Sequence, residues 1–127
     1  MEDFYIKSTS KTPYMNFQIA GIFEITGRSI PENSIEFYKP LLEWLDSYSL
    51  RKTIPSTHLQ IRLEYFNTSS SKCLLEIFKR MEGIAKNSSP TKISWQYEEE
   101  DEDMKELGED FKEILQIPVE LVPVKNY

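Results

Sequence analysis

Regular alternation of apolar and polar residues in four segments is the feature that most constrains the fold of this chain. The four segments are Met15–Ile19, Phe23–Ile25, Leu59–Tyr65 and Ile93–Tyr97. Successive side chains of a β-strand point to opposite faces, so this pattern predicts a sheet with one apolar and one polar face. A sheet covered on both faces would show continuous apolar strands instead. We therefore expect all helices to lie on one face, with the other face wet or available to a partner.

Three further segments have the three-to-four spacing of amphipathic helices. The first carries apolar residues from Ile35 to Tyr48 and has two candidate capping boxes, one beginning at Ser29 and one at Asn33. Pro40 lies inside this segment and predicts either a kink or two short helices in sequence. The remaining helices and the last strand are expected at residues 68–86, 104–114 and 119–124.

The predicted order of elements is β-β-α-β-α-β-α-β. Because strand–helix–strand units cross over right-handedly and place their strands parallel, the fold class is α/β: a two-layer, α+β-like arrangement with a five-stranded mixed sheet and three helices on one face. The polar residues 1–12 are expected to form a flexible N-terminal arm. Residues 13–127 are expected to form a single domain, as is usual for a chain of 127 residues.

Composition excludes several classes of function. The formal charge of −6 has the wrong sign for binding nucleic acid through phosphate contacts. Cys73 and His58 are the only residues of their types, so one chain can form neither a disulfide framework nor a Cys/His zinc site, and a reducing cytoplasm is the expected compartment. No apolar run is long enough to span a membrane. With four scattered glycines no nucleotide-binding loop can be assembled, so we expect no cofactor and no metal.

A run of polar residues joins the third alternating strand to the second predicted helix. It reads Asn67-Thr68-Ser69-Ser70-Ser71-Lys72. One interpretation is structural: Asn67 or Thr68 caps the helix and the serines satisfy its unpaired N–H groups. The other is that Thr68 accepts a phosphoryl group, which the positive end of a helix dipole tolerates and which Lys72 could pair with.

Two rival functions come from the same run. A serine of this cluster could act as an enzyme's nucleophile, but it would need an adjacent base, and His58 is predicted at the far end of the strand. A small anion- or ligand-binding domain could instead use the helix N-terminus that follows Asn67.

Two other features suggest contacts with a partner. The acidic run Glu98–Asp103 precedes the third helix, where carboxylates complement the helix dipole, and it could also face a basic partner or hold a weak Mg²⁺ ion. It lacks the ligand spacing and the glycine of a calcium loop. Trp44 lies one position off the apolar stripe of the first helix and is a candidate interface residue.

Four segments of the chain resemble the SiaC family of bacterial regulatory phosphoproteins. They are Gly27–Asn33, Glu36–Leu45, Leu63–Lys72 and Glu100–Met104, and the resemblance extends from about residue 8 to 123. It implies a cytoplasmic partner-switching protein, not an enzyme, with an architecture similar to anti-sigma-factor antagonist (STAS) domains.

The resemblance also assigns roles to residues and partners. It implies that Thr68 is phosphorylated by a dedicated GHKL-type kinase and dephosphorylated by a PP2C-type phosphatase. The unphosphorylated form is implied to bind an effector, in the best-known case a diguanylate cyclase of cyclic-di-GMP signalling. We expect Asn67, Ser69, Ser70, Ser71 and Lys72 to support the phosphosite. The candidate partner contacts are Tyr65, Phe66, Trp44, Glu100 and Asp101.

Overall fold

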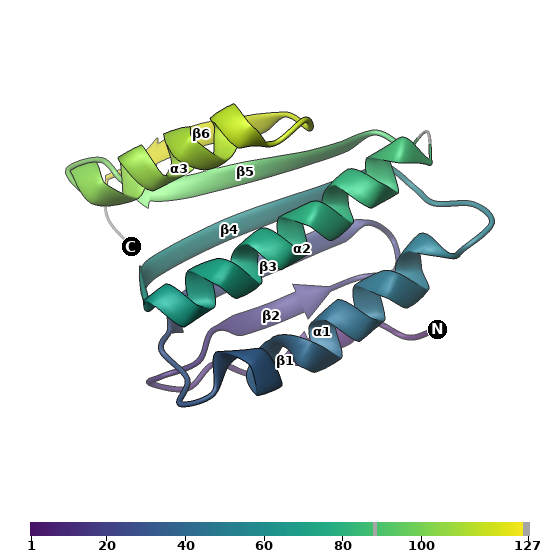
Figure 1. The fold of residues 1–127 in the computed structure, drawn as a ribbon, viewed down its shortest axis with the longest axis horizontal. Coiled ribbons are helices and arrows are strands. Elements are labelled where there is room, and N and C mark those ends of the chain that lie inside the picture. Colours follow the sequence, from purple (N-terminus) through teal and green to yellow (C-terminus); the bar gives the residue numbers. More distant parts are fainter. Residues whose placement is uncertain (88, 126–127) are drawn as a thin grey trace.

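A six-stranded sheet with three helices packed across one face makes up the chain (Figure 1). The computed structural model describes residues 1–87 and 89–125. In chain order the elements are β1 (Phe4–Ile6), β2 (Tyr14–Phe17), β3 (Ile22–Ser29), α1 (Ser34–Ser49), β4 (Thr57–Phe66), α2 (Thr68–Lys86), β5 (Thr91–Glu98), α3 (Glu102–Ile114) and β6 (Val119–Val124). The expected mixed α/β architecture, with all helices on one face, is confirmed.

The strands lie in the sheet in the same order as in the sequence. The β1–β2 and β2–β3 pairs are antiparallel, and β3 to β6 are parallel. On β4 the side chains of Leu59, Ile61 and Leu63 are buried beneath the helices, whereas Gln60 and Glu64 are exposed. This register is the predicted one through Leu63, but Tyr65, expected on the apolar face, is exposed because it lies near the end of β4. The sheet has one packed and one open face.

The predicted number of five strands is wrong, because β1 lies within the segment expected to be a flexible arm. It pairs with β2 at the edge of the sheet. Two side-chain contacts hold the segment: Trp44 Nε1 donates to the carbonyl oxygen of Glu2 at 2.7 Å, and Asp3 accepts from the Ile19 N–H at 2.8 Å. A strand of three residues is too short to show an alternating pattern, which is why the sequence gives no sign of it.

Helix α1 begins at the second of its two candidate caps. The Asn33 side chain accepts from the Glu36 N–H at 3.1 Å. The helix is continuous through Pro40, so the alternative of two short helices is wrong. Ile35, expected on the buried face, is 76% exposed. The inward-facing stripe instead consists of Ser34, Tyr38, Leu41, Leu45 and Tyr48.

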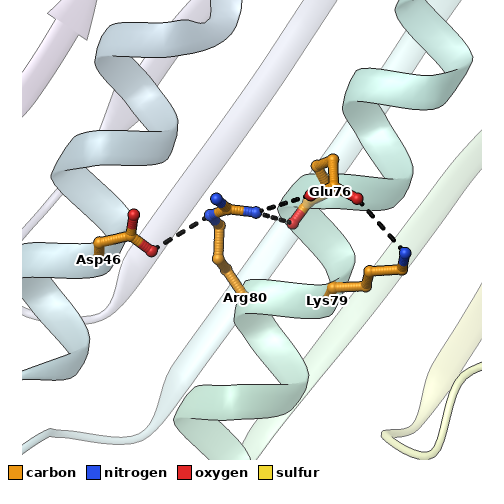
Figure 2. Close-up of polar contacts among 4 residues, drawn as sticks. All are labelled: Asp46, Glu76, Lys79 and Arg80. Atoms are coloured by element: carbon orange, nitrogen blue, oxygen red, sulfur yellow. Dashed lines mark hydrogen bonds and ion pairs between the residues drawn. The ribbon is translucent and has the colours of Figure 1, made fainter.

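Helices α1 and α2 are also joined through an ion-pair network (Figure 2). Arg80 of α2 lies 3.2 Å from Asp46 of α1 and 3.1 Å from Glu76 of its own helix. The Arg80 and Lys79 side chains bond to Glu76 and lower the pKa of its carboxyl. Each helix follows a parallel strand, so α1, α2 and α3 all begin at the carboxyl ends of these strands. Thr68, the first residue of α2, lies at this end of the sheet (Figure 1).

Candidate functional site

Thr68 is the first residue of α2, directly after the strand β4 has ended. Asn67 is the cap, since its side-chain oxygen accepts from the Ser70 N–H at 2.9 Å. Of the two capping residues considered from sequence, Asn67 therefore fills the position. Thr68 is exposed at the start of the helix, where an enzyme can reach its hydroxyl.

Beneath Thr68 lies a chain of buried hydroxyl groups. Tyr38 OH lies 2.5 Å from Ser29 Oγ, Ser29 Oγ donates to Ser70 Oγ at 2.9 Å, and Ser70 Oγ donates to the Ser29 carbonyl oxygen at 3.0 Å. All three side chains are fully buried. Burial raises the pKa of Tyr38, so this tyrosine stays a neutral donor. The chain fixes the start of α2 onto the end of β3.

A second hydroxyl contact joins the starts of α1 and α2. Ser34, the first residue of α1, has its Oγ 2.8 Å from Ser69 Oγ and 3.3 Å from Ser70 Oγ. The sequence analysis missed Ser34. The available signal was an Asn followed by a hydroxyl residue at both helix starts, Asn33-Ser34 and Asn67-Thr68, but only the fold places the two starts side by side.

The hydroxyl groups of residues 68–71 differ in whether they are already hydrogen-bonded or buried. Ser69 Oγ donates to Asn67 Oδ1 at 3.2 Å, Ser71 Oγ donates to the Thr68 carbonyl oxygen at 2.9 Å, and Ser70 is buried. Within residues 1–87 and 89–125, Thr68 Oγ1 has no hydrogen-bond partner. Thr68 thus combines exposure with a free hydroxyl.

The two helix starts at Thr68 suit a negative charge. The first turns of two helices meet there, and each helix start carries partial positive charge from its unpaired N–H groups. Lys72 is exposed one helical turn further along α2. A phosphoryl group on Thr68 would be compatible with the helix rather than expelled by it.

The candidate partner contacts fall into two places. Tyr65, 58% exposed, and the half-buried Phe66 end β4 immediately before the hydroxyl run. Asp101 caps α3 by accepting from the Met104 N–H at 3.1 Å, and Glu100 is exposed beside it. All four residues lie at the carboxyl-terminal end of the parallel strands, as Thr68 does.

Trp44 lies elsewhere. It is ten residues along α1 from Ser34, or about 15 Å at the rise of an α-helix. Its ring stacks on Tyr48 with a 5.3 Å centroid separation, and its Nε1 is bonded to the N-terminal segment. Near the hydroxyl run the structure places Ile35, a large apolar side chain next to Ser34 that the sequence analysis expected on the buried face.

The histidine is far from the hydroxyl run. His58 is the second residue of the ten-residue strand β4, and the hydroxyl run follows the end of that strand. Its Nε2 lies 2.7 Å from Ser94 Oγ of β5. Desolvation lowers the pKa of His58. A serine nucleophile in the hydroxyl run would therefore not have this imidazole as its base.

Over residues 1–87 and 89–125 no helix has the length and apolarity needed to cross a membrane. In the same part of the chain, no three His, Cys, Asp or Glu side chains gather in a way that could hold a metal ion.

Comparison with known proteins gives consistent matches. The model of a family described as SiaC family regulatory phosphoprotein matches residues 6–124. An uncharacterised protein of Pseudomonas aeruginosa (strain UCBPP-PA14) is 32% identical over 120 residues, which cover 93% of this chain and 94% of that protein.

Two solved structures are similar in fold and sequence. Apo-SiaC from Pseudomonas aeruginosa has a TM-score of 0.86 and 30% identity, with 96% of this chain and 99% of that chain covered. SiaC in a complex with the diguanylate cyclase SiaD, which it activates, has a TM-score of 0.86 and 30% identity and covers 96% of this chain and 100% of that chain.

Proposed function

The chain belongs to the SiaC family of regulatory phosphoproteins, and from this premise we propose that it is a non-enzymatic switch whose state is set by reversible phosphorylation of Thr68. A kinase of the GHKL type adds the phosphoryl group from ATP, and a PP2C-type phosphatase removes it. The unphosphorylated protein binds a downstream effector in the cytoplasm. The site thus changes charge without any cofactor bound to this chain.

The assignment of Thr68 as the phosphoacceptor rests on one observation. Thr68 is exposed and its hydroxyl has no partner among the described residues, while its neighbours Ser69 and Ser71 are bonded and Ser70 is buried. A kinase needs an accessible hydroxyl that it can place in line with the phosphate of ATP. Transfer to Ser69 or Ser71 would first have to break an existing hydrogen bond, and transfer to Ser70 would require local unfolding.

Phosphorylation changes the surface rather than the fold. The phosphoryl group brings about −1.5 to −2 charges and three acceptor oxygens. At a helix N-terminus each negative charge is stabilising, typically by about 0.3–1 kcal/mol. The domain therefore keeps its structure while the area around Thr68 becomes strongly hydrated and anionic.

The effector is of the diguanylate cyclase class in this proposal. Support comes from the similar SiaC of Pseudomonas aeruginosa, which is found in a complex with the cyclase SiaD. Exposed Ile35 and Tyr65 near Thr68 supply apolar contact area for such a partner. The helix-covered sheet, with a helix start carrying the phosphosite, also supports the comparison with anti-sigma-factor antagonist domains.

Site mapping tests the proposal. The full chain is incubated with ATP and the GHKL-type kinase encoded in the same genome, and the modified residue is located by peptide mass spectrometry. We expect one phosphoryl group per chain, on Thr68. Thr68→Ala should remain unmodified, and the matched variants Ser69→Ala and Ser71→Ala should be modified like the wild type. Phosphate on Ser69 or Ser71 of the wild-type protein would contradict the assignment.

A second candidate, a passive anion-binding domain, is favoured by the meeting of two helix starts at Ser34 and Ser69. It predicts saturable binding of inorganic phosphate or sulfate to the unmodified protein. The switch model predicts that such binding is absent at millimolar concentrations, because the phosphate must be tethered to Thr68. Calorimetric titration with both anions separates the two functions.

A further inference from the structure

A small groove lies next to the phosphosite, between the end of β4 and the start of α3. Its volume is about 200 Å³, and its apolar lining is provided by Tyr65, Phe66, Met104 and Leu107. Phe66 and Met104 are anchored in the core: the Phe66 ring is edge-on to Trp95 at 6.2 Å, and Met104 is buried. The groove is thus a fixed feature whose outer wall, Tyr65, is exposed.

The rim of this groove is acidic. Glu64, Asp101 and Asp103 line it together with the apolar residues. An adjoining hollow of about 300 Å³ shares Tyr65 and adds Glu98 and Arg28. Among the described residues, Arg28 is the one basic residue that lines either hollow, and it is already bonded to Glu64 at 3.0 Å. The floor of the groove is therefore apolar and its rim is negatively charged.

The shape and charge together fit an arginine side chain. Its apolar stem can lie on an aromatic ring while the planar guanidinium stacks or reaches carboxylates at the edge. A purely apolar side chain in the groove would leave the exposed Asp103 carboxylate unpaired, and an anion in the groove would be repelled. Tyr65 offers the ring, and Asp103 offers an exposed carboxylate beside it.

We propose that this groove is the docking site for an arginine flanked by an apolar residue on the surface of the effector. The inference rests on the proposed switch and names the chemistry of its partner. The docked segment runs from the groove across Thr68 toward Ile35, whose neighbour Ser34 contacts Ser69.

Phosphorylation opposes this docking although the arginine is positively charged. A pair of exposed charges changes an affinity only by a factor of about two to five. Burying a dianion beneath a docked apolar segment costs far more, roughly a hundredfold or more in affinity. The desolvation of the phosphate on Thr68 therefore outweighs its attraction for the arginine.

The test uses two peptide probes and the full-length protein. Acetyl-leucyl-arginine amide and its neutral isostere acetyl-leucyl-citrulline amide are titrated into ¹⁵N-labelled protein, and backbone amide shifts are followed by NMR. We expect saturable shifts at Tyr65, Phe66, Met104 and Leu107 with the arginine probe, and binding weaker by about two- to fivefold with citrulline. No saturable shift at these amides, or equal binding of the two probes, would overturn the proposal.

Matched variants localise the binding. Asp103→Asn should lower the affinity for the arginine probe by about two- to fivefold. Asp110 is an exposed acid two turns along the same helix, and Asp110→Asn should leave this affinity unchanged. Tyr65→Phe should retain binding and Tyr65→Ala should lose it. Equal effects of Asp103→Asn and Asp110→Asn would overturn the assignment to the groove.

Binding to the diguanylate cyclase of the same genome separates the groove from the switch. If phosphorylation of Thr68 releases the cyclase but Asp103→Asn and Asp110→Asn bind it equally well, the switch stands and the groove proposal fails. If Asp103→Asn lowers the affinity for the cyclase but phosphorylation of Thr68 leaves that affinity unchanged, the groove proposal stands and the proposed switch fails.

Discussion

Ser34 Oγ of α1 lies 2.8 Å from Ser69 Oγ of α2, so the first turns of the two helices touch directly beside Thr68. The contact brings together residues 35 positions apart in the sequence. It places Thr68, the proposed phosphosite, over two helix starts rather than one. We therefore expect this surface to accept added negative charge without a change of fold.

The buried hydroxyl chain should contribute measurably to stability. Tyr38→Phe removes the hydroxyl that lies 2.5 Å from Ser29 Oγ in a fully buried position. We expect a loss of about 1–2 kcal/mol in the free energy of unfolding. Tyr65→Phe, the exposed control, should change it by less than about 0.5 kcal/mol. Urea denaturation of both variants measures the difference, and equal values would contradict the role of the chain.

The cap of α2 should matter more to folding than the phosphoacceptor does. Asn67→Ala removes the side-chain oxygen bonded to the Ser70 N–H and should cost about 0.5–2 kcal/mol. Thr68→Ala removes an exposed hydroxyl without a partner in the described chain, so its cost should stay within about 0.5 kcal/mol. Denaturation curves for the pair decide this. A Thr68→Ala variant as unstable as Asn67→Ala would show that Thr68 has a structural role.

Two glycines of different surroundings test the packing of the helix layer. A Cβ on Gly108 would lie 2.5 Å from Trp95 Cδ1, whereas a Cβ on Gly83 would meet nothing within 4 Å. Gly108→Ala should therefore destabilise the protein by about 1–3 kcal/mol through overpacking. Gly83→Ala should stabilise it by up to about 1 kcal/mol through higher helix propensity. Thermal melts of the two variants should shift in opposite directions.

Acid should weaken the ion pairs that Glu76 makes with Lys79 and Arg80 within α2. Hydrogen bonds from Arg80 and Lys79 lower the pKa of Glu76 in the folded state, so its contribution is fully present above its unfolded pKa of about 4.3 and is lost as pH falls through the lower folded value. Because the side chain is 44% exposed, this contribution should not exceed about 1 kcal/mol.

The matched measurement compares unfolding of the wild type and Glu76→Gln between pH 7 and pH 3. The wild type should be more stable at pH 7, and the two curves should converge below pH 4. A constant difference over the whole range would show that Glu76 acts by packing and not by charge.

Local patterns were sufficient for the elements whose burial is regular. The alternation of Leu59 to Leu63 predicted β4, and the polar run from Asn67 predicted the start of α2, but the choice of Asn67 over Thr68 as the cap came from the structure. The three-residue β1 was missed because its stability comes from pairing with β2 and from the contacts of Trp44 and Asp3.

The parts of the site that could not be predicted are those built from distant segments. The Ser34–Ser69 contact depends on the parallel strands β3 and β4, which bring the starts of α1 and α2 to the same end of the sheet. The groove depends on the packing of Met104 and Leu107 against the end of β4. Neither arrangement leaves a periodic signal in the sequence.

The most direct measurement of the central claim is a calorimetric titration of the cyclase encoded in the same genome with two forms of this protein, unmodified and stoichiometrically phosphorylated on Thr68. The account predicts binding by the unmodified form and an affinity lower by roughly a hundredfold or more for the phosphorylated form, with circular dichroism showing the same fold for both. Thr68→Glu should weaken binding only in part, because one carboxylate carries less charge and fewer acceptors. Equal affinities of the two forms would contradict the account.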